Sequence, residues 1–179
     1  MKDFRIKDDQ LVLLNEVKNT ELDIIWDINA FYFNSESTTY KLDCISSYPE
    51  GATGQYDEIF YTNFSKLKSK SIFELNNTKY WYKIIDNKSR IESIELVNII
   101  QEFPQNRLLN DKTESKNPDG LNYITSGLII KTGNGYVPAL LLPSNHGFTW
   151  QTKYEYYTEA EIDDILKTDI KKYRKKNCA

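Results

Sequence analysis

This sequence is poor in the residues that most often build metal and redox sites. It has one histidine, two cysteines and one methionine among 179 residues. Zinc sites generally need three or four histidine, cysteine or carboxylate ligands, and no CxxC, HxxxH or HExxH spacing supplies them. Two cysteines, Cys44 and Cys178, make a poor disulfide framework, so we expect both to be free thiols. The sequence therefore indicates no metal centre and no cofactor.

Long apolar runs are missing as well. No run approaches the roughly 20 apolar residues that a membrane-spanning helix needs. The first ten residues carry charges where a secretory signal has its apolar stretch. Hydrophobic residues make up 40% of the chain and charged residues 27%, which is typical of a globular protein. We therefore expect a cytoplasmic protein with a single domain over residues 1–179 and no membrane partner.

The charge of the chain is distributed unevenly. The formal net charge is −3, but six basic residues crowd positions 167–179. The remainder has 17 basic and 25 acidic residues, a net charge of −8. An acidic body repels nucleic acid and attracts cationic partners. We therefore expect a protein partner and no nucleic acid, and we interpret the basic end as a helix terminus that complements its own dipole.

Glycine is scarce, and its clearest use is a tight turn. Gly133-Asn134-Gly135 separates two strand-like segments, which predicts a β-hairpin. Thr158 and Glu161 form a capping-box pattern that begins an amphipathic helix over 158–176. Alternating or β-branched segments predict further strands at 22–33, 38–44, 56–61, 71–75 and 79–85, and the apolar residues of 91–99 favour a short helix.

These elements predict an α+β fold. We expect a mainly antiparallel sheet of about six to eight strands, with the C-terminal helix packed on one face. Residues 109–120 lack an apolar anchor and are expected to form a mobile loop, and residues 177–179 a frayed tail. The apolar block 11–14 fits either a strand or a buried helix.

Catalytic motifs are weak in this chain. His146 follows a predicted strand, where it could act as a general base, so a small hydrolase or transferase is the alternative hypothesis. Asp23 and Asp27 would share one strand face, but solvated positions beside apolar neighbours explain them without catalysis. The sequence therefore favours a binding protein over an enzyme.

The segment from Gly127 to Tyr136, followed by 157–162, resembles the small immunity proteins of bacterial polymorphic and contact-dependent toxin systems. Members of this group are acidic single-domain inhibitors that occlude a cognate toxin, so the resemblance implies a protein-binding inhibitor. Aromatic and acidic side chains, which are suited to anchoring and steering a partner, alternate in 48–61 and 144–157. We expect contacts with a cationic toxin domain at Tyr48, Glu50, Tyr56, Asp57, Glu58, His146, Trp150 and Glu155.

Overall fold

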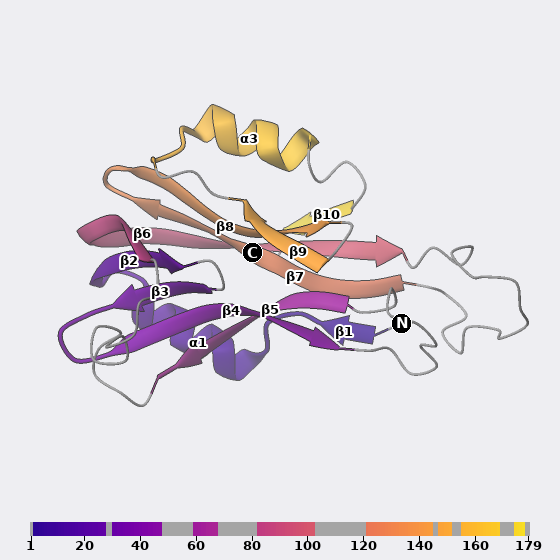
Figure 1. The fold of residues 1–179 in the computed structure, drawn as a ribbon, viewed down its shortest axis with the longest axis horizontal. Helices are drawn as coiled ribbons and strands as arrows, with labels where there is room; N and C mark the ends of the chain where they lie inside the picture. The colour runs from indigo at the N-terminus through magenta and orange to yellow at the C-terminus, as the bar shows by residue number, and fades with distance from the viewer. Residues whose placement is uncertain are drawn as a thin grey trace, which may run out of the picture.

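The protein is mostly β. The computed structural model describes residues 2–27, 30–47, 59–67, 82–102, 121–144, 147–151, 155–168 and 174–177. Within these ranges ten strands form one sheet that curls into a nearly closed barrel, accompanied by two short helices (Figure 1). The predicted α+β class is therefore wrong, because the helices are minor additions to a curled sheet.

The strands follow the order β5-β4-β3-β2-β6-β7-β8-β9 across the sheet. β1 pairs with β7 in parallel. Every other pair, including that of β10 with β6, is antiparallel. The bounds are β1 Lys2–Phe4, α1 Asp8–Val17, β2 Glu21–Asp27, β3 Ala30–Asn34, β4 Thr39–Ser47, β5 Ile59–Lys66, β6 Tyr82–Glu102, β7 Leu121–Thr132, β8 Gly135–Ser144, β9 Gly147–Gln151, α3 Glu159–Thr168 and β10 Arg174–Asn177.

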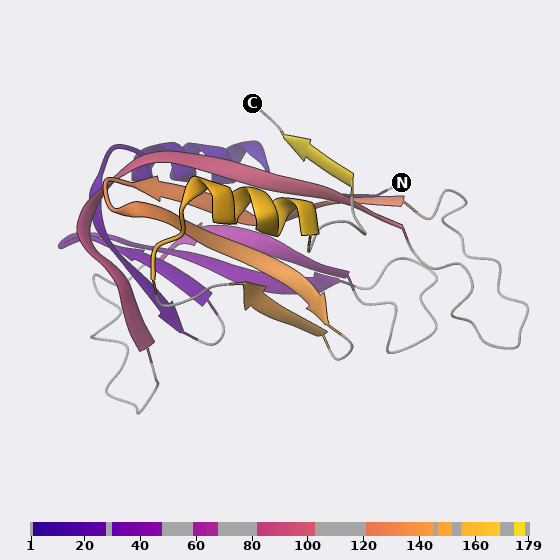
Figure 2. The same cartoon turned by 90° about the horizontal axis from the view of Figure 1, so that it is seen from above.

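The long strand β6 connects the two halves of the barrel. Up to Arg90 it pairs with β2, and from Ile91 onwards it pairs with β7. Opposite Asp23 it carries an extra residue, and Lys88 there has a φ of 51°. The Lys88 N–H donates to the Asp23 carboxylate at 3.0 Å, which satisfies a group that the bulge removes from the ladder. Because bulges bend a strand, this one contributes, with the other register shifts of β6, to the strong curvature of β6 seen from above (Figure 2).

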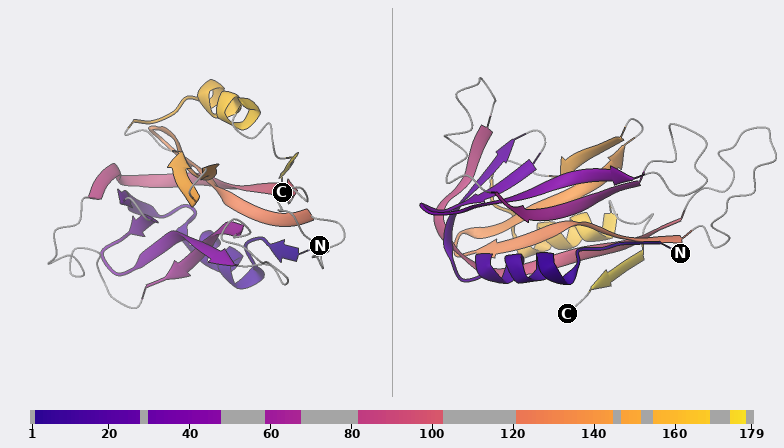
Figure 3. Two further views of the ribbon diagram at one scale, coloured as in Figure 1. Left: turned by 45° about the vertical axis from the view of Figure 1, so that its right-hand side comes forward. Right: turned by 90° about the horizontal axis from the view of Figure 1, so that it is seen from below.

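Apolar side chains form two clusters on the two faces of the sheet. Leu128 and Ile130 belong to one cluster and Ile129 to the other, because successive residues of a strand face opposite ways. The inner cluster fills the barrel with Phe31, Phe33, Leu42 and Phe64, and α1 adds Leu14 and Val17. The outer cluster lies under α3, which contributes Ile162 and Ile165. The two helices therefore lie on opposite sides of the molecule (Figures 1 and 3).

The barrel approaches closure where β8 leaves β7. The two strands pair as far as Gly127, and β1 pairs with β7 beyond that point. Between them, the Ser126 hydroxyl donates to the Leu141 carbonyl at 2.7 Å. The Thr62 hydroxyl of β5 donates to the Thr125 carbonyl at 2.9 Å, which brings β5 against β7. Side chains thus replace the backbone ladder at this junction.

Two local predictions in the second half of the chain are confirmed, the hairpin turn and the start of the C-terminal helix. The Gly133-Asn134-Gly135 turn joins β7 to β8, and Gly135 has a φ of 136°. The capping box is present: the Thr158 N–H donates to Glu161 Oε2 at 2.8 Å, and the Glu161 N–H donates to Thr158 Oγ1 at 3.3 Å. The predicted helix extent is wrong, because α3 ends at Thr168 and β10 begins at Arg174.

Several strand predictions need correction. Segment 22–33 forms two strands, β2 and β3, instead of one, and 91–99 is part of strand β6 instead of a helix. The sheet has ten strands instead of six to eight. The predicted pair 38–44 and 56–61 appears as β4 and, from Ile59 onwards, β5, and residues 56–58 lie outside the described residues. The predicted strand 71–75, the loop 109–120 and residues 178–179 of the predicted tail lie outside the described residues, whereas Asn177 of that tail belongs to β10.

Candidate functional site

The outward side of α3 is acidic. Ile162 and Ile165 pack towards the sheet, and three carboxylates of the same helix, Glu159, Asp163 and Asp164, are exposed. We use the name acidic face for the exposed residues Glu155, Glu159, Asp163 and Asp164. Lys167 is the one base in α3, and its Nζ lies 3.6 Å from Asp163 Oδ2. The acidic face therefore has a net negative charge that faces solvent.

The acidic face is held in place by contacts of Tyr157, which lies two residues before α3, and by the capping box. Tyr157 forms a β-bridge with Tyr136, with N–H to carbonyl distances of 2.8 and 3.0 Å. Its side chain is buried in the outer cluster together with Ile162 and Ile165. The capping box then fixes where the helix begins. These contacts define the position of the carboxylates before any partner binds.

Two of the eight predicted contact residues lie in the described part of the chain. Glu155 is exposed and belongs to the acidic face. Trp150 is 7% exposed, and its ring packs edge-on against Phe31 at a centroid distance of 5.1 Å. Its burial in the inner cluster rules out the predicted surface contact. The other six, with the alternative general base His146 among them, lie outside the described residues: Tyr48, Glu50, Tyr56, Asp57, Glu58 and His146.

Three members of the acidic face were not predicted as contacts. Glu159, Asp163 and Asp164 are acids near the start of a helix, where interaction with the helix dipole is sufficient to explain them. The signal that identifies them is their exposure on a helix whose Ile162 and Ile165 are buried in the outer cluster.

The carboxylate pair of β2 has a structural role. Asp23 accepts the Lys88 N–H in the bulge of β6. Asp27 accepts the Ala30 N–H at 2.8 Å and the Tyr32 hydroxyl at 2.9 Å. Burial first, and then the neighbouring Asp27 carboxylate, raises the pKa of Tyr32 above its ordinary value. Asp23 therefore stabilises the bulge of β6, and Asp27 connects the end of β2 to β3.

A buried carboxylate lies near the tip of the β7–β8 hairpin. Asp86 is 2% exposed, and neither of its oxygens accepts a well-formed hydrogen bond from any residue that the structure describes. The Tyr156 hydroxyl faces it, and the pKa of Tyr156 is raised by burial first and by Asp86 second. The Asn134 amide donates to Ser89 Oγ at 2.8 Å and to the Tyr156 hydroxyl at 3.2 Å, which completes the cluster.

Replacing Asp86 with asparagine is expected to raise the free energy of unfolding by about 1–3 kcal/mol. A buried carboxylate that accepts no well-formed hydrogen bond from the described residues is costly, and asparagine keeps the shape without the charge. Urea unfolding at neutral pH measures the difference, with Asp9→Asn as the control because Asp9 is exposed on α1. A destabilised Asp86→Asn protein would mean that the carboxylate makes a required contact.

No protein-family model, curated protein or solved structure matches this chain. Neither of the two helices in the described ranges has the length and apolar content needed to cross a membrane. Within the same ranges, no three histidine, cysteine, aspartate or glutamate side chains gather as metal ligands.

Proposed function

We propose that this protein binds and neutralises a basic protein partner, and that it is an immunity protein for a bacterial toxin, acting in the cytoplasm. The observation that carries the proposal is the acidic face, in which four exposed carboxylates, three on α3 and Glu155 just before it, lie on a segment fixed to the barrel. The resemblance of the segment from Gly127 to Tyr136 and 157–162 to immunity proteins supports the same function.

Electrostatic complementarity explains how such a face would act. The chain up to residue 166 has a net charge of −8, so the whole body attracts a basic protein, and the acidic face directs where it docks. The attraction reaches about 8 Å at physiological salt. Complementary charge mainly increases the rate of association and suppresses wrong partners, which suits an inhibitor that must capture a toxin quickly.

The anchoring of α3 adds to the expected affinity. A helix fixed by a β-bridge, a capping box and two buried isoleucines has little freedom to lose when a partner binds. Association is weakened whenever side chains and backbone must be ordered at the interface. A preformed acidic face avoids much of that cost.

Reversing two charges of the acidic face tests the proposal. The double variant Glu155→Lys, Asp163→Lys is expected to bind the toxin encoded beside its gene about tenfold more weakly at low salt. The difference should shrink at about 300 mM salt, where screening is stronger. Isothermal titration calorimetry at both salt concentrations measures this, and thermal unfolding checks that the variant remains folded.

A matched control separates local contact from total charge. Glu21 and Glu36 are exposed, lie on β2 and in the β3–β4 turn, and are absent from α3. Glu21→Lys, Glu36→Lys changes the net charge by the same amount and should weaken binding far less. Equal losses in both double variants would show general charge attraction only, and the acidic face would then not be the contact surface. Cells that gain no protection from the toxin would contradict the function itself.

A further inference from the structure

A groove lies on the side of the molecule away from α3, where the β1–α1 connection passes over β6. Its cavity volume is about 540 Å³, within the usual range of small-molecule sites. Ile6, Leu11 and Leu96 supply an apolar lining, and Ile6 is itself 8% exposed. The groove is therefore large enough for a small ligand with an apolar body.

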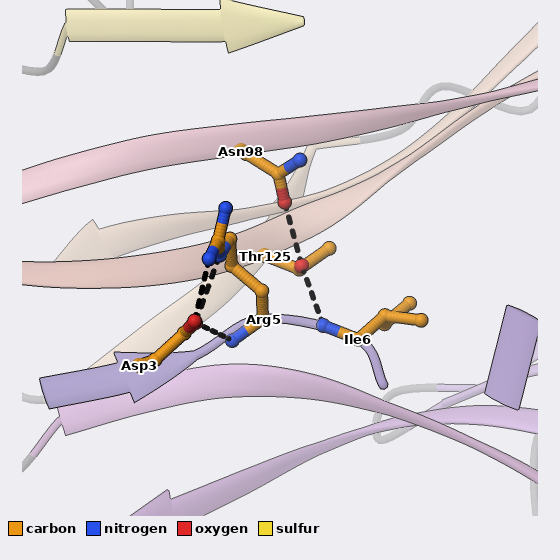
Figure 4. Close-up of polar contacts among 5 residues, drawn as sticks. All are labelled: Asp3, Arg5, Ile6, Asn98 and Thr125. Atoms are coloured by element: carbon orange, nitrogen blue, oxygen red, sulfur yellow. Dashed lines mark hydrogen bonds and ion pairs between the residues drawn. The ribbon is translucent and has the colours of Figure 1, made fainter. Parts of the chain in front are cut away.

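A buried amide lines this groove with unused donors. The Ile6 N–H donates to Thr125 Oγ1 at 2.9 Å, and the Thr125 hydroxyl donates to Asn98 Oδ1 at 2.7 Å (Figure 4). Asn98 is 4% exposed and lines the groove. This relay uses the oxygen of the Asn98 amide, and no described residue accepts a hydrogen bond from its Nδ2. Nδ2 is not one of the fully buried atoms that lack a partner, and Asn98 lines the groove, so this donor is available to a ligand that accepts hydrogen bonds.

The charged groups around the groove do not repel an anion, because the two acids and two bases of its lining cancel. Lys7 is exposed and immediately precedes α1, and a lysine side chain has no acceptor with which to cap the first-turn N–H groups. Arg5 forms a double hydrogen bond with Asp3, with Nε 2.8 Å from Oδ1. That bond lowers the pKa of Asp3 and offsets its charge. Asp8 is the opposing carboxylate of the lining, and Lys7 beside it balances that charge.

We infer that the groove binds a carboxylate carried on an apolar body, with the carboxylate on Asn98 Nδ2, Lys7 and the start of α1, and the apolar part on Leu11 and Leu96. A free short-chain acid and the apolar C-terminal residue of a peptide share this chemistry. The inference is independent of the acidic face, which lies on the other side of the molecule (Figure 3).

Titrations followed by ¹H–¹⁵N NMR test the site. Octanoate is expected to bind with a dissociation constant of about 1 mM or lower and to shift the Asn98 side-chain amide and the Ile6 backbone amide. Octylammonium, with the same chain length and opposite charge, should leave both signals in place. Acetyl-Gly-Gly-Leu with a free carboxylate, compared with its C-terminal amide, distinguishes a peptide end from a free acid as the preferred source.

Two variants identify the recognising groups. Lys7→Gln is expected to weaken octanoate binding about fivefold, whereas Lys18→Gln, at the other end of α1, should leave it unchanged. Asn98→Asp keeps an oxygen for Thr125 but removes the donor, and should weaken binding more than tenfold. If Asn98→Asp does not fold, the Lys7 and Lys18 pair decides. Equal binding of octylammonium, equal effects of the two lysine variants, or no shift at Asn98 would overturn the inference.

Discussion

Replacing Gly127 with alanine is expected to lower the free energy of unfolding by about 3 kcal/mol or more. The residue has a φ of 154°, and an added Cβ would lie 2.0 Å from the Ala139 carbonyl oxygen and 2.8 Å from Leu140 Cα. Both neighbours are backbone of β8, so they cannot rotate away as a side chain could. The clash falls where β8 leaves β7 and where Thr62 and Ser126 join the barrel through side-chain bonds.

Gly133→Ala is the matched control for this substitution. A Cβ at Gly133 meets only the flexible end of Glu92, at 3.9 Å, and the residue is exposed in the hairpin turn. Urea unfolding followed by circular dichroism should show a large loss for Gly127→Ala and a change within about 1 kcal/mol for Gly133→Ala. Similar midpoints for the two variants would mean that β8 does not approach β7 as closely as the structure indicates.

Phe64→Ala is expected to cost about 3–5 kcal/mol of stability. Phe64 is 1% exposed on β5, with ring centroids 5.7 Å from Phe33 and 5.9 Å from Tyr40. Removing the ring leaves a cavity among strands that bend around it and cannot collapse freely. The loss should also weaken the contact of β5 with β7, which brings the barrel near closure.

Val12→Ala provides the comparison for Phe64→Ala. Val12 is 59% exposed on α1, and alanine is the better helix former, so little change is expected. Differential scanning calorimetry of the three proteins measures the two shifts. A small shift for Phe64→Ala, comparable to that of Val12→Ala, would contradict the placement of β5 over the inner cluster.

Local signals were sufficient for the hairpin and for the start of α3. A glycine-rich turn and a capping box act through neighbouring residues only, so the sequence contains all the information that they need. The end of α3 was not predictable in the same way. β10 begins at Arg174 because its backbone pairs with an edge of β6 that is distant in sequence.

Bulges explain why 91–99 was taken for a helix. β6 has irregular pairing with β7 between Ile91 and Ser93 and again between Val97 and Asn98. The first adds a residue, Glu92, to β6 and moves the following side chains to the other face, so Ile91 and Ile94 share a face at a spacing of three, as in a helix. The second adds Ser126 to β7 and leaves the alternation of β6 unchanged. Ile91 and Ile94 therefore face the inner cluster, whereas Val97 and Ile99 face the outer one.

Asp27 was interpreted as a solvated residue within one strand, although it marks a turn. Its carboxylate accepts the Ala30 N–H three residues later, which is how aspartate commonly stabilises a change of direction. The sequence shows the residue but not the bond. One strand was therefore predicted where β2 and β3 form an antiparallel pair.

The acidic character of the candidate site could be predicted from the sequence, but most of the residues that form it could not. Acidic charge follows from composition, and Glu155 is exposed as expected. Trp150 was misplaced because a tryptophan in a strand looks the same whether it anchors a partner or fills a core. Its pairing with Leu141 sets which face it occupies, and Leu141 belongs to the inner cluster. That register depends on tertiary pairing, which the local pattern does not encode.

Hydrogen exchange of the complex tests the role of the acidic face most directly. The protein is mixed with the toxin encoded beside its gene, and backbone exchange is measured by mass spectrometry with and without that partner. The proposal predicts that exchange slows in residues 155–168, which contain the acidic face, and stays unchanged in α1. Slower exchange elsewhere, with residues 155–168 unaffected, would contradict the assignment of the acidic face as the surface that captures the partner.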